Sequence, residues 1–588
     1  MVKRIAIVEK DKCHSEKCNW LCPKKCPVNL DEVECISKDN EKAGIDEKLC
    51  VGCGICQRIC PFHAIQIVNL PSELKEEPIH RFGKNSFRLY RLALPKKGIV
   101  TGILGRNGIG KSTALGILAG QFIPNLGDYK TKELNYDNLI EKNSNNILGE
   151  YFRNLKNRKI KISYKPQRVE LLTKLYNESV NVLLKKIDER NISDVLIDEF
   201  NMDNVLKRKL NELSGGELQK VAIIATLVKN ADVYYFDEPM TFLDVVTRIK
   251  AAKMIKEYTK EKACLVVEHD LTSLDYISDE VQIVYGEAGA YGVFSNGKSV
   301  SKGINDYLEG YLLEENVRFR DYSIKYSKVA MTKDVQRETV FEFPEIKKKY
   351  PGFDLDVKSG KLHKGEVLAI MGANGLGKST FLKILAGIEK ADNVKLNRIN
   401  FSYKEQVLMQ DSELSVEEFF NEHKVEMSSG WYKQNILDKL GIGRILLNKM
   451  NELSGGELQK VHIALALSKK VDLILLDEPS AFIDVEDRLK VAEIIKEFTV
   501  KKEVSTIVVD HDVQFIDYLA DSLLVFSGES GKHGHVEKAL DKKDGMNQVL
   551  KLLDITYRID KTSGRRRINK PDSVLDREQR KKGEYYYI

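Results

Sequence analysis

The heptapeptide Leu-Ser-Gly-Gly-Glu-Leu-Gln occurs twice in the chain, at residues 213–219 and at residues 453–459. A glycine-rich phosphate loop precedes each copy and an Asp-Glu pair follows it, so one polypeptide carries two sets of ATPase motifs. Nine of the ten cysteines lie within the first 60 residues, ahead of both copies. This arrangement predicts two ATP-binding units behind a small cysteine-rich head.

Both phosphate loops have the Walker A spacing, with Lys111 and Lys378 as the lysines. The glycines let backbone N–H groups surround the phosphates, the lysine reaches the β- and γ-phosphates, and the following serine binds Mg²⁺. Each loop follows a short apolar strand (residues 99–104 and 367–371) and precedes a plausible helix. The predicted nucleotide contacts are Gly105, Asn107, Gly108, Gly110, Lys111, Ser112 and Thr113 in the first copy, and Gly372, Asn374, Gly375, Gly377, Lys378, Ser379 and Thr380 in the second.

Two further apolar strands end in the acidic pairs Asp237-Glu238 and Asp477-Glu478. The aspartate is predicted to hold Mg²⁺ through water, and the glutamate to polarise the attacking water. A histidine follows a second buried strand in each copy, at His269 and His511. A lone histidine is usually a packing residue, but its recurrence at nearly the same offset makes each a candidate γ-phosphate sensor.

An aromatic side chain upstream of each Walker A loop is expected to stack on the adenine. Tyr90 is the candidate in the first copy. In the second copy Phe353 fits a Phe-x-Leu-x-Val pattern, and the nearby Tyr350 is the alternative.

The head contains two groups of four cysteines, and each group ends in Cys-Pro. The downstream group matches the bacterial ferredoxin ligand run at every spacing, and the upstream group is spaced more loosely. The cysteine before the proline ordinarily ligates the other cluster, so we pair the groups crosswise. The predicted ligands are Cys13, Cys18, Cys22 and Cys60 for one 4Fe–4S cluster, and Cys26, Cys50, Cys53 and Cys56 for the other.

Two cysteines remain outside these sets: we assign Cys35 no ligand role and expect Cys264, in an apolar run, to be a core residue. A zinc site is the alternative, although eight cysteines exceed what one zinc ion needs. The head could transfer electrons or serve as a rigid structural part. The chain has no flavin or nicotinamide fingerprint, which favours the structural or mechanical role.

The composition is that of a globular protein, with 588 residues, 42% hydrophobic residues, 31% charged residues and a net charge of +6. The first residues lack the apolar core of a signal peptide, and no run approaches the ~20 apolar residues of a membrane span. We therefore expect a soluble, cytoplasmic protein without membrane contact. In that compartment a cysteine cluster indicates metal more often than disulfides.

The two copies differ by an insertion. The two heptapeptides are 240 positions apart, and so are the two acidic pairs, whereas Lys111 and Lys378 are 267 positions apart. The first copy therefore has 27 extra residues, which lie between Lys111 and Gln167. We place them at about residues 125–162 and predict a helical hairpin with a basic face that suits RNA phosphate. A solvated charged face is the alternative. The basic positions are Lys130, Lys132, Lys142, Arg153, Lys156, Arg158, Lys159 and Lys161.

The C-terminal segment is rich in arginine and lysine. We expect it to be too charged for core and either to brace the two halves or to contact RNA, with a disordered tail as the alternative. The predicted organisation is a head (1–75), a first ATPase domain (76–304), a hinge (305–325), a second ATPase domain (326–545) and a basic hinge or tail (546–588).

The motifs over residues 85–545 resemble those of ATP-binding-cassette (ABC) ATPases, whose signature is the repeated heptapeptide. The resemblance implies two composite sites, in which the signature of one copy closes on nucleotide held by the other. It maps the Q-loop glutamine, also an Mg²⁺ contact, to Gln167 and Gln406, and the D-loop aspartate to Asp244 and Asp484. The signature contacts would be Ser214, Gly215, Gly216 and Glu217, and Ser454, Gly455, Gly456 and Glu457.

Twin cassettes behind a two-cluster head resemble the ABC subfamily E ribosome-recycling ATPases of archaea and eukaryotes, over essentially the whole chain. This resemblance implies two tandem α/β P-loop ATPase domains after a small α+β ferredoxin-like domain. It also implies ATP-driven splitting of ribosomes, retention on the small subunit and its rRNA, and a release factor or Pelota-like partner, with initiation factors as further candidates. A monomer with intramolecular cassette pairing is expected. A soluble ABC-F translation factor, which would lack iron, a transporter ATPase and an iron–sulfur redox ATPase are the alternatives.

Overall fold

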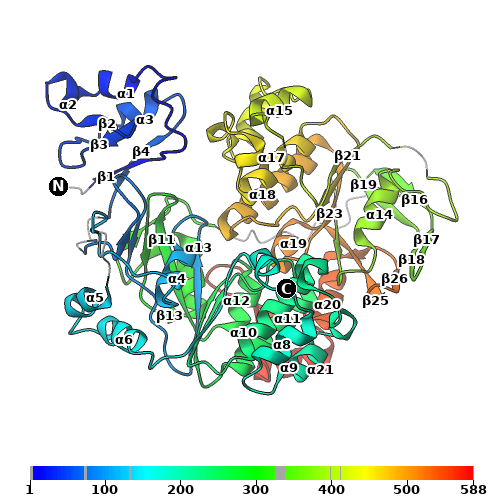
Figure 1. Ribbon diagram of the computed structural model, residues 1–588. Helices are drawn as coiled ribbons and strands as arrows, with labels where there is room; N and C mark the ends of the chain where they lie inside the picture. Colours follow the sequence, from blue (N-terminus) through cyan, green and yellow to red (C-terminus); the bar gives the residue numbers. More distant parts are fainter. Residues whose placement is uncertain are drawn as a thin grey trace.

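The computed structural model describes residues 4–71, 74, 76–131, 135–324, 338–396, 399–410 and 412–586. Two α/β lobes lie side by side, and a small head sits on the first of them (Figure 1). The predicted fold class agrees with the structure: a small α+β head precedes two α/β lobes. We refer to the lobes as cassette one and cassette two.

The head is built from two small antiparallel pairs of strands and three short helices. Strand β1 (Arg4–Val8) pairs with β4 (Ile65–Asn69), and β2 (Ile36–Asp39) pairs with β3 (Lys42–Ile45). The helices are α1 (Leu21–Lys24), α2 (Pro27–Leu30) and α3 (Ile55–Ile59). Cysteines make up much of the buried core of the head, so it has few aliphatic side chains with which to stabilise itself.

Cassette one is organised around a mostly parallel sheet of order β5-β6-β12-β11-β7-β10-β9-β8. Its strands are β5 (His80–Arg81), β6 (Arg88–Tyr90), β7 (Val100–Gly105), β8 (Ile162–Lys165), β9 (Val233–Asp237), β10 (Ala263–Val267), β11 (Glu280–Glu287), β12 (Tyr291–Phe294) and β13 (Lys298–Ser299). The helices that position its motifs are α4 (Lys111–Leu118), α10 (Gly215–Leu227), α11 (Val245–Tyr258), α12 (Leu271–Ile277) and α13 (Val300–Glu309). Strands β7, β9 and β10 are mostly apolar and are buried at every residue, as expected for parallel strands covered on both faces.

This strand order brings three motifs together at one edge. The Walker A loop leaves the end of β7, the acidic pair ends β9, and the strand between them, β10, leads to His269. The predicted Walker A strand begins and ends one residue later than expected, and helix α4 begins at Lys111, because the lysine and serine form its first turn.

Cassette two repeats this order as β21-β22-β23-β20-β24-β27. Its parallel strands are β20 (Val367–Met371), β21 (Phe401–Lys404), β22 (Leu473–Asp477), β23 (Ser505–Val509) and β24 (Ser522–Val525), with β27 (Leu540–Asp541) antiparallel at the edge. Two further small sheets, of order β16-β19 and β17-β18-β26-β25, contain β16 (Thr339–Phe343), β17 (Ile346–Tyr350), β18 (Phe353–Val357), β19 (Gly360–His363), β25 (Ser527–Glu529) and β26 (His533–Val536). Their pairs are antiparallel except for β18 with β26, which is parallel. The helices are α14 (Lys378–Leu385), α15 (Val416–Glu422), α16 (Gly430–Tyr432), α17 (Gly455–Leu467), α18 (Val485–Lys502), α19 (Val513–Leu519) and α20 (Lys542–Leu552).

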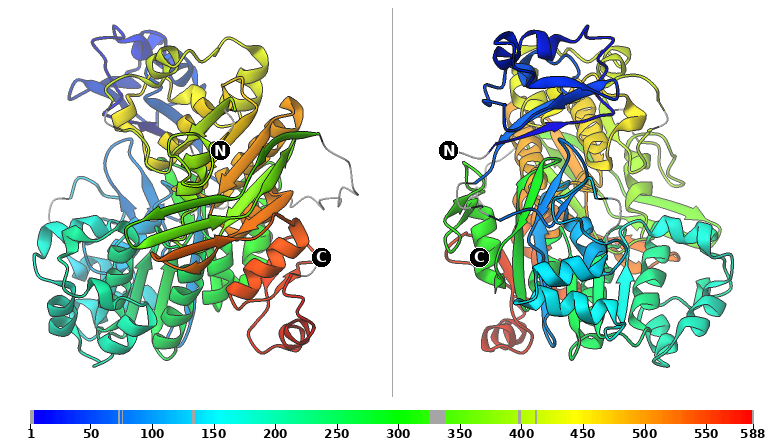
Figure 2. Two further views of the ribbon diagram at one scale, coloured as in Figure 1. Left: turned by 90° about the vertical axis from the view of Figure 1, so that its right-hand side faces the viewer. Right: turned by 60° about the vertical axis from the view of Figure 1, so that its left-hand side comes forward.

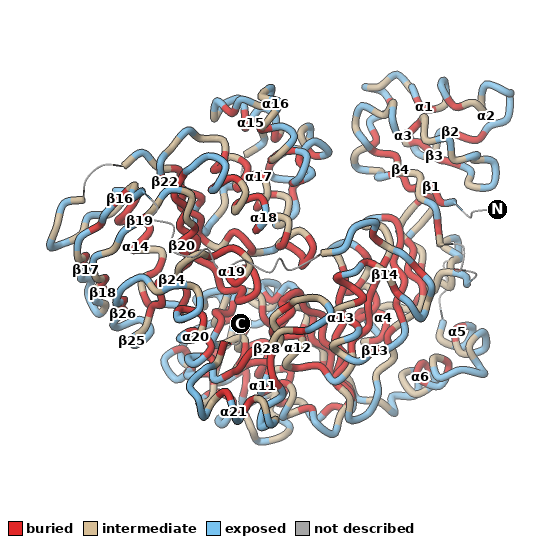
Figure 3. Tube along the Cα trace, turned by 180° about the vertical axis from the view of Figure 1, so that it is seen from behind, coloured by how far each residue is buried: buried red, intermediate tan, exposed pale blue. Residues whose placement is uncertain are grey.

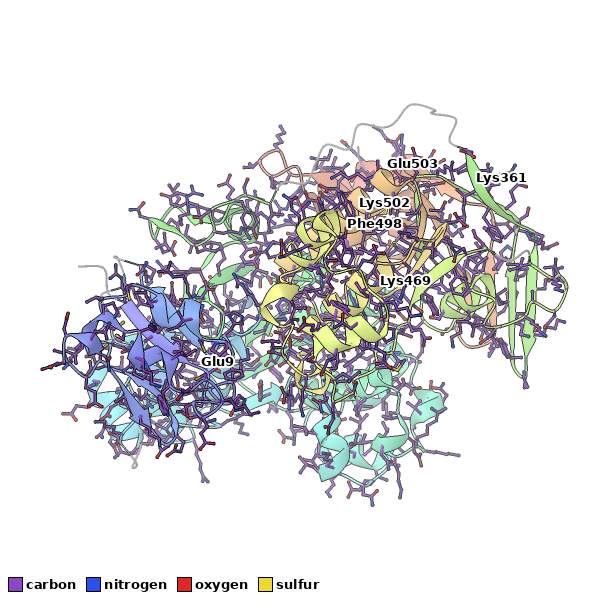
Figure 4. The ribbon with its side chains drawn as sticks, turned by 90° about the horizontal axis from the view of Figure 1, so that it is seen from above. Glu9, Lys361, Lys469, Phe498, Lys502 and Glu503 are labelled. Atoms are coloured by element: carbon purple, nitrogen blue, oxygen red, sulfur yellow. The ribbon has the colours of Figure 1, made fainter. Side chains whose placement is uncertain are left out.

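Helix α18 joins the sheet of cassette two to its helical part. Phe498 near its end packs beside Trp431, and the ammonium of Lys502 lies 4.1 Å from the centre of the Trp431 ring. Figure 4 shows Phe498 and Lys502 on this helix, away from the head residue Glu9. Within the described parts of the chain, no helix is long and apolar enough to cross a membrane.

The insertion in cassette one folds as two helices, α5 (Tyr136–Lys142) and α6 (Ile147–Lys156), that pack against each other. Tyr151 anchors them to the cassette, because its hydroxyl contacts the carbonyl of Leu118 at 2.6 Å and the hydroxyl of Tyr235 at 2.7 Å. The predicted basic positions that the structure describes are all exposed; Lys132 lies outside the described residues.

The C-terminal segment corrects one expectation, because its charged residues do form core. It folds into β28 (Tyr557–Ile559), β29 (Arg566–Ile568) and α21 (Val574–Lys582), beside α20 in Figure 2. Arg565 is fully buried, and its guanidinium lies 3.2 Å from Asp275 of cassette one. Tyr557 also reaches cassette one, where its hydroxyl is 2.9 Å from that of Thr272. The segment therefore braces both cassettes.

Candidate active sites

The two Walker A loops have the same internal geometry. The ammonium of Lys111 donates to the carbonyls of Gly105 at 2.9 Å and Arg106 at 2.6 Å. Lys378 makes the equivalent bonds to Gly372 at 3.0 Å and Ala373 at 2.6 Å. These bonds hold each lysine inside its loop, where the motif needs a cation for the phosphates.

The Walker B aspartates are shaped for a cation. Asp237 and Asp477 are buried, and neither oxygen of either carboxylate has a hydrogen-bond partner in the described structure. Burial, together with the adjacent Glu238, raises the pKa of Asp237 to about 6, and burial likewise raises that of Asp477 to about 6. Buried unpartnered carboxylate oxygens next to the Walker A serine fit a hard, oxygen-binding ion such as Mg²⁺.

The candidate catalytic glutamates lie beside two other predicted site residues, the Q-loop glutamine and the sensor histidine. Oε1 of Glu238 accepts a hydrogen bond from Gln167 at 2.8 Å and lies 3.5 Å from Nε2 of His269. Glu478 has the same neighbours, Gln406 at 2.7 Å and His511 at 3.4 Å. Both glutamates adopt left-handed backbone, with φ of 48° and 49°. This conformation is costly for a non-glycine residue, and here it recurs at the matching position of both cassettes.

The charge states of Glu238 and His269 suit a general base and a neutral γ-phosphate sensor, respectively. Burial works against ionisation of Glu238, but His269 and Lys111 outweigh it and hold its pKa at about 2. Burial and the neighbouring Lys111 lower the pKa of His269, so its imidazole is neutral at pH 7. Burial and Lys378 lower the pKa of His511 in the same way.

Sequence reasoning missed two pairs of residues that hold the acidic turns in place. The buried ammonium groups of Lys165 and Lys404 donate to the carbonyls of Asp237 and Asp477, at 2.8 and 2.6 Å. Gln219 and Gln459, at the end of each heptapeptide, donate to the carbonyls of Glu238 and Glu478, at 2.8 and 2.5 Å. The signal was present, since both pairs recur at matching positions of the two copies.

The D-loop aspartates reach across to the other cassette. Asp484 accepts a hydrogen bond from the backbone N–H of Asn107 at 3.2 Å, and Asp244 accepts one from that of Asn374 at 3.0 Å. Phe242 and Phe482 meet edge-on between them, with ring centroids 5.7 Å apart. Each Walker A loop is therefore completed by a residue of the opposite cassette.

In the described structure the signature serines form hydrogen bonds within their own cassettes. Ser214 and Ser454 are exposed and cap their own helices, bonded to Glu217 and Glu457 at 2.9 and 2.6 Å. Within the described residues, no hydrogen bond joins either serine to the opposite Walker A loop. Gly216 and Gly456 need to lack a side chain, because a Cβ would lie 2.9 Å from the carbonyl of Phe242 or Phe482.

One predicted adenine contact is wrong. Tyr90 is only 1% exposed and packs edge-on against Tyr291, so its ring cannot stack on a nucleotide. Phe87 has the position that we expected for Tyr90, because Phe87 lies against Gly110 just as Phe353 lies against Gly377. The repeated Phe-x-Leu at residues 87–89 and 353–355 could have identified it. Tyr350, the other candidate in cassette two, instead bonds Glu389 through its hydroxyl.

The head brings its cysteines together in two groups. Burial, and after it the nearby thiols of Cys13, Cys18 and Cys60, raise the pKa of Cys22 to about 12. Burial raises that of Cys56 to about 11, with Cys50, Cys53 and Cys26 around it. These neighbours are the ones that the crosswise pairing groups together, and the two ligand sets for 4Fe–4S clusters stay a prediction. Cys35 lines the same cavity as the second group.

The head docks on cassette one through Asn85. The side chain of this buried residue bonds the carbonyls of Ala6 and Ile45 at 3.1 and 3.0 Å and the N–H of Ile45 at 2.9 Å. Arg88 adds an ion pair with Glu47 of the head.

Comparisons with known proteins agree with this geometry over the whole chain. The ABC transporter family matches residues 93–241 and 355–481, and the 4Fe-4S binding domain family matches residues 43–66. An uncharacterized ABC transporter ATP-binding protein of Methanocaldococcus jannaschii is 46% identical over 100% of this chain and 98% of its own. Translation initiation factor RLI1 of Saccharomyces cerevisiae is 40% identical over 100% and 98%. A solved structure of ribosome-bound archaeal Pelota and ABCE1 includes a chain with a TM-score of 0.94 and 47% identity, covering 100% of both chains.

Proposed function

The chain belongs to ABC subfamily E, and from this premise we propose that it splits ribosomes into large and small subunits after termination or stalling. It then stays on the small subunit until ATP is hydrolysed. The observation that carries the proposal is the extent of the likeness, because the head, both cassettes and the C-terminal segment all match a protein solved on the ribosome. A likeness limited to the cassettes would support only ATP hydrolysis.

ATP hydrolysis to ADP and phosphate would occur at two composite sites. In site one Lys111 neutralises the phosphates, Glu238 accepts the proton of the attacking water, and neutral His269 donates to the γ-phosphate. In site two Lys378, Glu478 and His511 have these roles. Mg²⁺, when bound beside Ser112 and Asp237 or Ser379 and Asp477, supplies positive charge for the developing oxyanion. The serine and glycines of each signature would complete the opposite site.

Closure of the cassettes would drive the head. The exposed signature serines have room to approach the opposite nucleotide, and the D-loop contacts supply the pivot. Because Asn85 and Arg88 fasten the head to cassette one, rotation of cassette two towards cassette one would change the position of cassette two relative to the head. A rigid head then acts as a wedge between subunits. The two sets of four cysteines favour two 4Fe–4S clusters, which would cross-link a domain that has little hydrophobic core of its own.

The partners follow from exposed charge and from the family. The basic hairpin of α5 and α6 presents exposed Arg153, Lys156 and Arg158, which would contact rRNA phosphate of the small subunit. A release factor or Pelota-like protein would be the second partner, and initiation factors further ones. The chain would act as a cytoplasmic monomer with paired cassettes. The proposed domains are the head (1–75), cassette one (76–304), a hinge (305–325), cassette two (326–545) and the C-terminal segment (546–588).

A sucrose-gradient assay tests the proposal. Ribosomes are mixed with the protein, a release factor or Pelota-like factor, and either ATP or a non-hydrolysable analogue. We expect ATP-dependent conversion to free subunits and, with the analogue, protein held on the small subunit. Intact ribosomes that carry the protein throughout would favour an ABC-F-like binding factor. Absence of ribosome association would favour an iron–sulfur redox ATPase.

A further inference from the structure

A single arginine of cassette two contacts both γ-phosphate sensor loops. Nη1 of Arg488 donates to Asp512, next to His511 in its own cassette, at 2.8 Å. The same nitrogen donates to the backbone carbonyl of His269 in cassette one at 3.3 Å. These contacts lie between helices α12 and α19, which pack against each other at the buried centre of the molecule (Figure 3).

The surroundings of Arg488 are anionic on both sides. Burial opposes its charge, but four carboxylates raise the pKa of Arg488, namely Asp512, Asp270, Asp510 and Glu268. These residues flank His269 and His511 in the sequence, and of the four only Asp512 is within hydrogen-bond distance of the Arg488 guanidinium. Its side chain is only 13% exposed, and a buried cation among carboxylates from two lobes holds those lobes in one arrangement.

Arg488 is also tied to the other contacts between the cassettes. Its Nε donates to the carbonyl of Ile483 at 2.8 Å, one residue before the D-loop aspartate Asp484. Asp484 begins helix α18 and accepts from Asn107 of cassette one. On the other side, Asp512 caps helix α19 by accepting from the N–H groups of Gln514 and Phe515, both at 2.9 Å. A shift of either sensor loop therefore moves the guanidinium of Arg488, which the other loop also contacts.

The equivalent arginine of cassette one lacks this bridge. Arg248 repeats the bond to its own D-loop, from Nε to the carbonyl of Leu243 at 2.8 Å. Its Nη1 lies 3.6 Å from Oδ2 of Asp270, which is longer than the 2.8 Å between Arg488 and Asp512. Nowhere in the described part of the chain does Arg248 form a hydrogen bond with cassette two. The charge of Arg248 does act on Glu478 and His511 of cassette two, but among the described residues only Arg488 bridges the two sensor loops by hydrogen bonds, although the two arginines occupy matching places in the repeat.

We propose that Arg488 is a positioning residue that couples the two ATP sites, by fixing the carbonyl of His269 in site one while it is paired with Asp512 beside His511 in site two. Occupancy of one site sets the position of its sensor histidine, and the guanidinium passes that displacement to the other loop. Coupling between two binding sites typically changes affinity by roughly 5- to 150-fold. The inference goes beyond ribosome splitting and rests on the paired ATP sites alone.

Equilibrium binding of a non-hydrolysable ATP analogue with Mg²⁺ tests the inference. For the unmodified protein we expect two sites per chain and a Hill coefficient that departs from one. Arg488→Gln should retain both sites but bring the Hill coefficient to one, and its steady-state kinetics should show a larger change in kcat than in KM. Arg248→Gln is the matched control and should keep the parental Hill coefficient.

Two further variants keep the test decisive. Arg488→Lys preserves the charge but not the two-sided contact, so it should restore folding and only part of the coupling. Melting curves establish that each variant is folded, and if Arg488→Gln is not, the lysine variant is compared with the parent. A parental Hill coefficient of one, an unchanged coefficient in the folded Arg488 variants, or an equal loss in Arg248→Gln would overturn the proposal.

Discussion

Oδ2 of Asp484 accepts a hydrogen bond from the backbone N–H of Asn107 at 3.2 Å, across the boundary between the cassettes. The same carboxylate caps helix α18 through its other oxygen, which accepts from Asp487 at 3.0 Å. One side chain thus starts a helix in cassette two and fixes a phosphate loop in cassette one. The pair Asp244 and Asn374 repeats the arrangement in the opposite direction.

Asp484→Ser separates these two tasks. Serine is a good helix cap but is too short to reach Asn107, so we expect a nearly unchanged melting temperature. Loss of a hydrogen bond to a charged group, worth about 1.5–3 kcal/mol, should slow ATP turnover at site one roughly 10- to 150-fold. Steady-state ATPase rates of Asp484→Ser and of its counterpart Asp244→Ser measure this. Parental turnover in both variants would contradict a role for the D-loop contact.

Replacement of both candidate catalytic glutamates, Glu238→Gln and Glu478→Gln, should trap ATP in a closed form. Glutamine keeps the shape and the bond to Gln167 or Gln406 but cannot accept a proton. General-base catalysis contributes typically about 10²–10⁴-fold, so we expect a loss of that size in the double variant. Retention of radiolabelled ATP after gel filtration measures trapping, and each single variant is the control. Rapid turnover in the double variant would refute the catalytic assignment.

Phe87→Ala should raise the KM for ATP at site one, because it removes the ring beside the Walker A loop. Stacking of a base on an aromatic ring is worth about 1–3 kcal/mol, which corresponds to a roughly 5- to 150-fold weaker affinity. Tyr90→Phe is the matched control and should leave KM unchanged, since that ring is buried against Tyr291. Titration with a fluorescent ATP analogue distinguishes the two. A larger effect at Tyr90 would restore the original assignment.

The contrast between these aromatics illustrates what the sequence could predict. Motifs whose function depends on local geometry, such as Lys111 with its loop, were assigned from spacing alone. A count back from the loop selects Tyr90 wrongly, because strand neighbours alternate between faces and the count does not say which face a ring occupies. The repeat itself held the better information, in the shared Phe-x-Leu of both copies.

The C-terminal segment could not be predicted for a different reason. A run such as Arg565 to Arg567 indicates solvent exposure, because burying a guanidinium is costly without a partner. Here the partner is Asp275, which lies about half the chain away and pairs with both Arg565 and Arg567. The exposure of Ser214 and Ser454 was likewise beyond prediction, since a sequence does not specify how far the two cassettes have closed.

Cys53→Ser should remove one of two proposed clusters and Cys35→Ser neither. Cys53 belongs to the second thiol group, whereas Cys35 lines the same cavity but donates its S–H towards the carbonyl of Asp46. We expect about half of the iron to be lost in Cys53→Ser and none in Cys35→Ser, with ATP binding intact in both. Iron analysis and the visible absorption spectrum measure this. Equal iron loss in the two variants would make Cys35 a ligand.

Lys404 should make the stability of cassette two depend on pH above 8. Burial lowers its pKa from 10.5 to about 8 in the folded protein. Between these values the unfolded chain binds more protons than the folded one, so the unfolding free energy rises with pH. The gain relative to Lys404→Met should reach on the order of 3 kcal/mol by pH 10.5, at about 1.36 kcal/mol per pKa unit. Below pH 8 the lysine is charged in both states and contributes no slope.

The fluorescence of Trp431 reports this change, because it lies in cassette two and Trp20, the second tryptophan, can be replaced by phenylalanine. Urea unfolding at pH 8 and pH 10 is compared for the parent, Lys404→Met and the exposed control Lys390→Met. We expect the gap between parent and Lys404→Met to widen in favour of the parent at the higher pH, while the control follows the parent. A gap that stays constant would mean that Lys404 keeps its proton, held by the carbonyls of Asp477 and Glu478. In that case the ammonium would serve as a permanent clamp on the acidic turn rather than a titrating one.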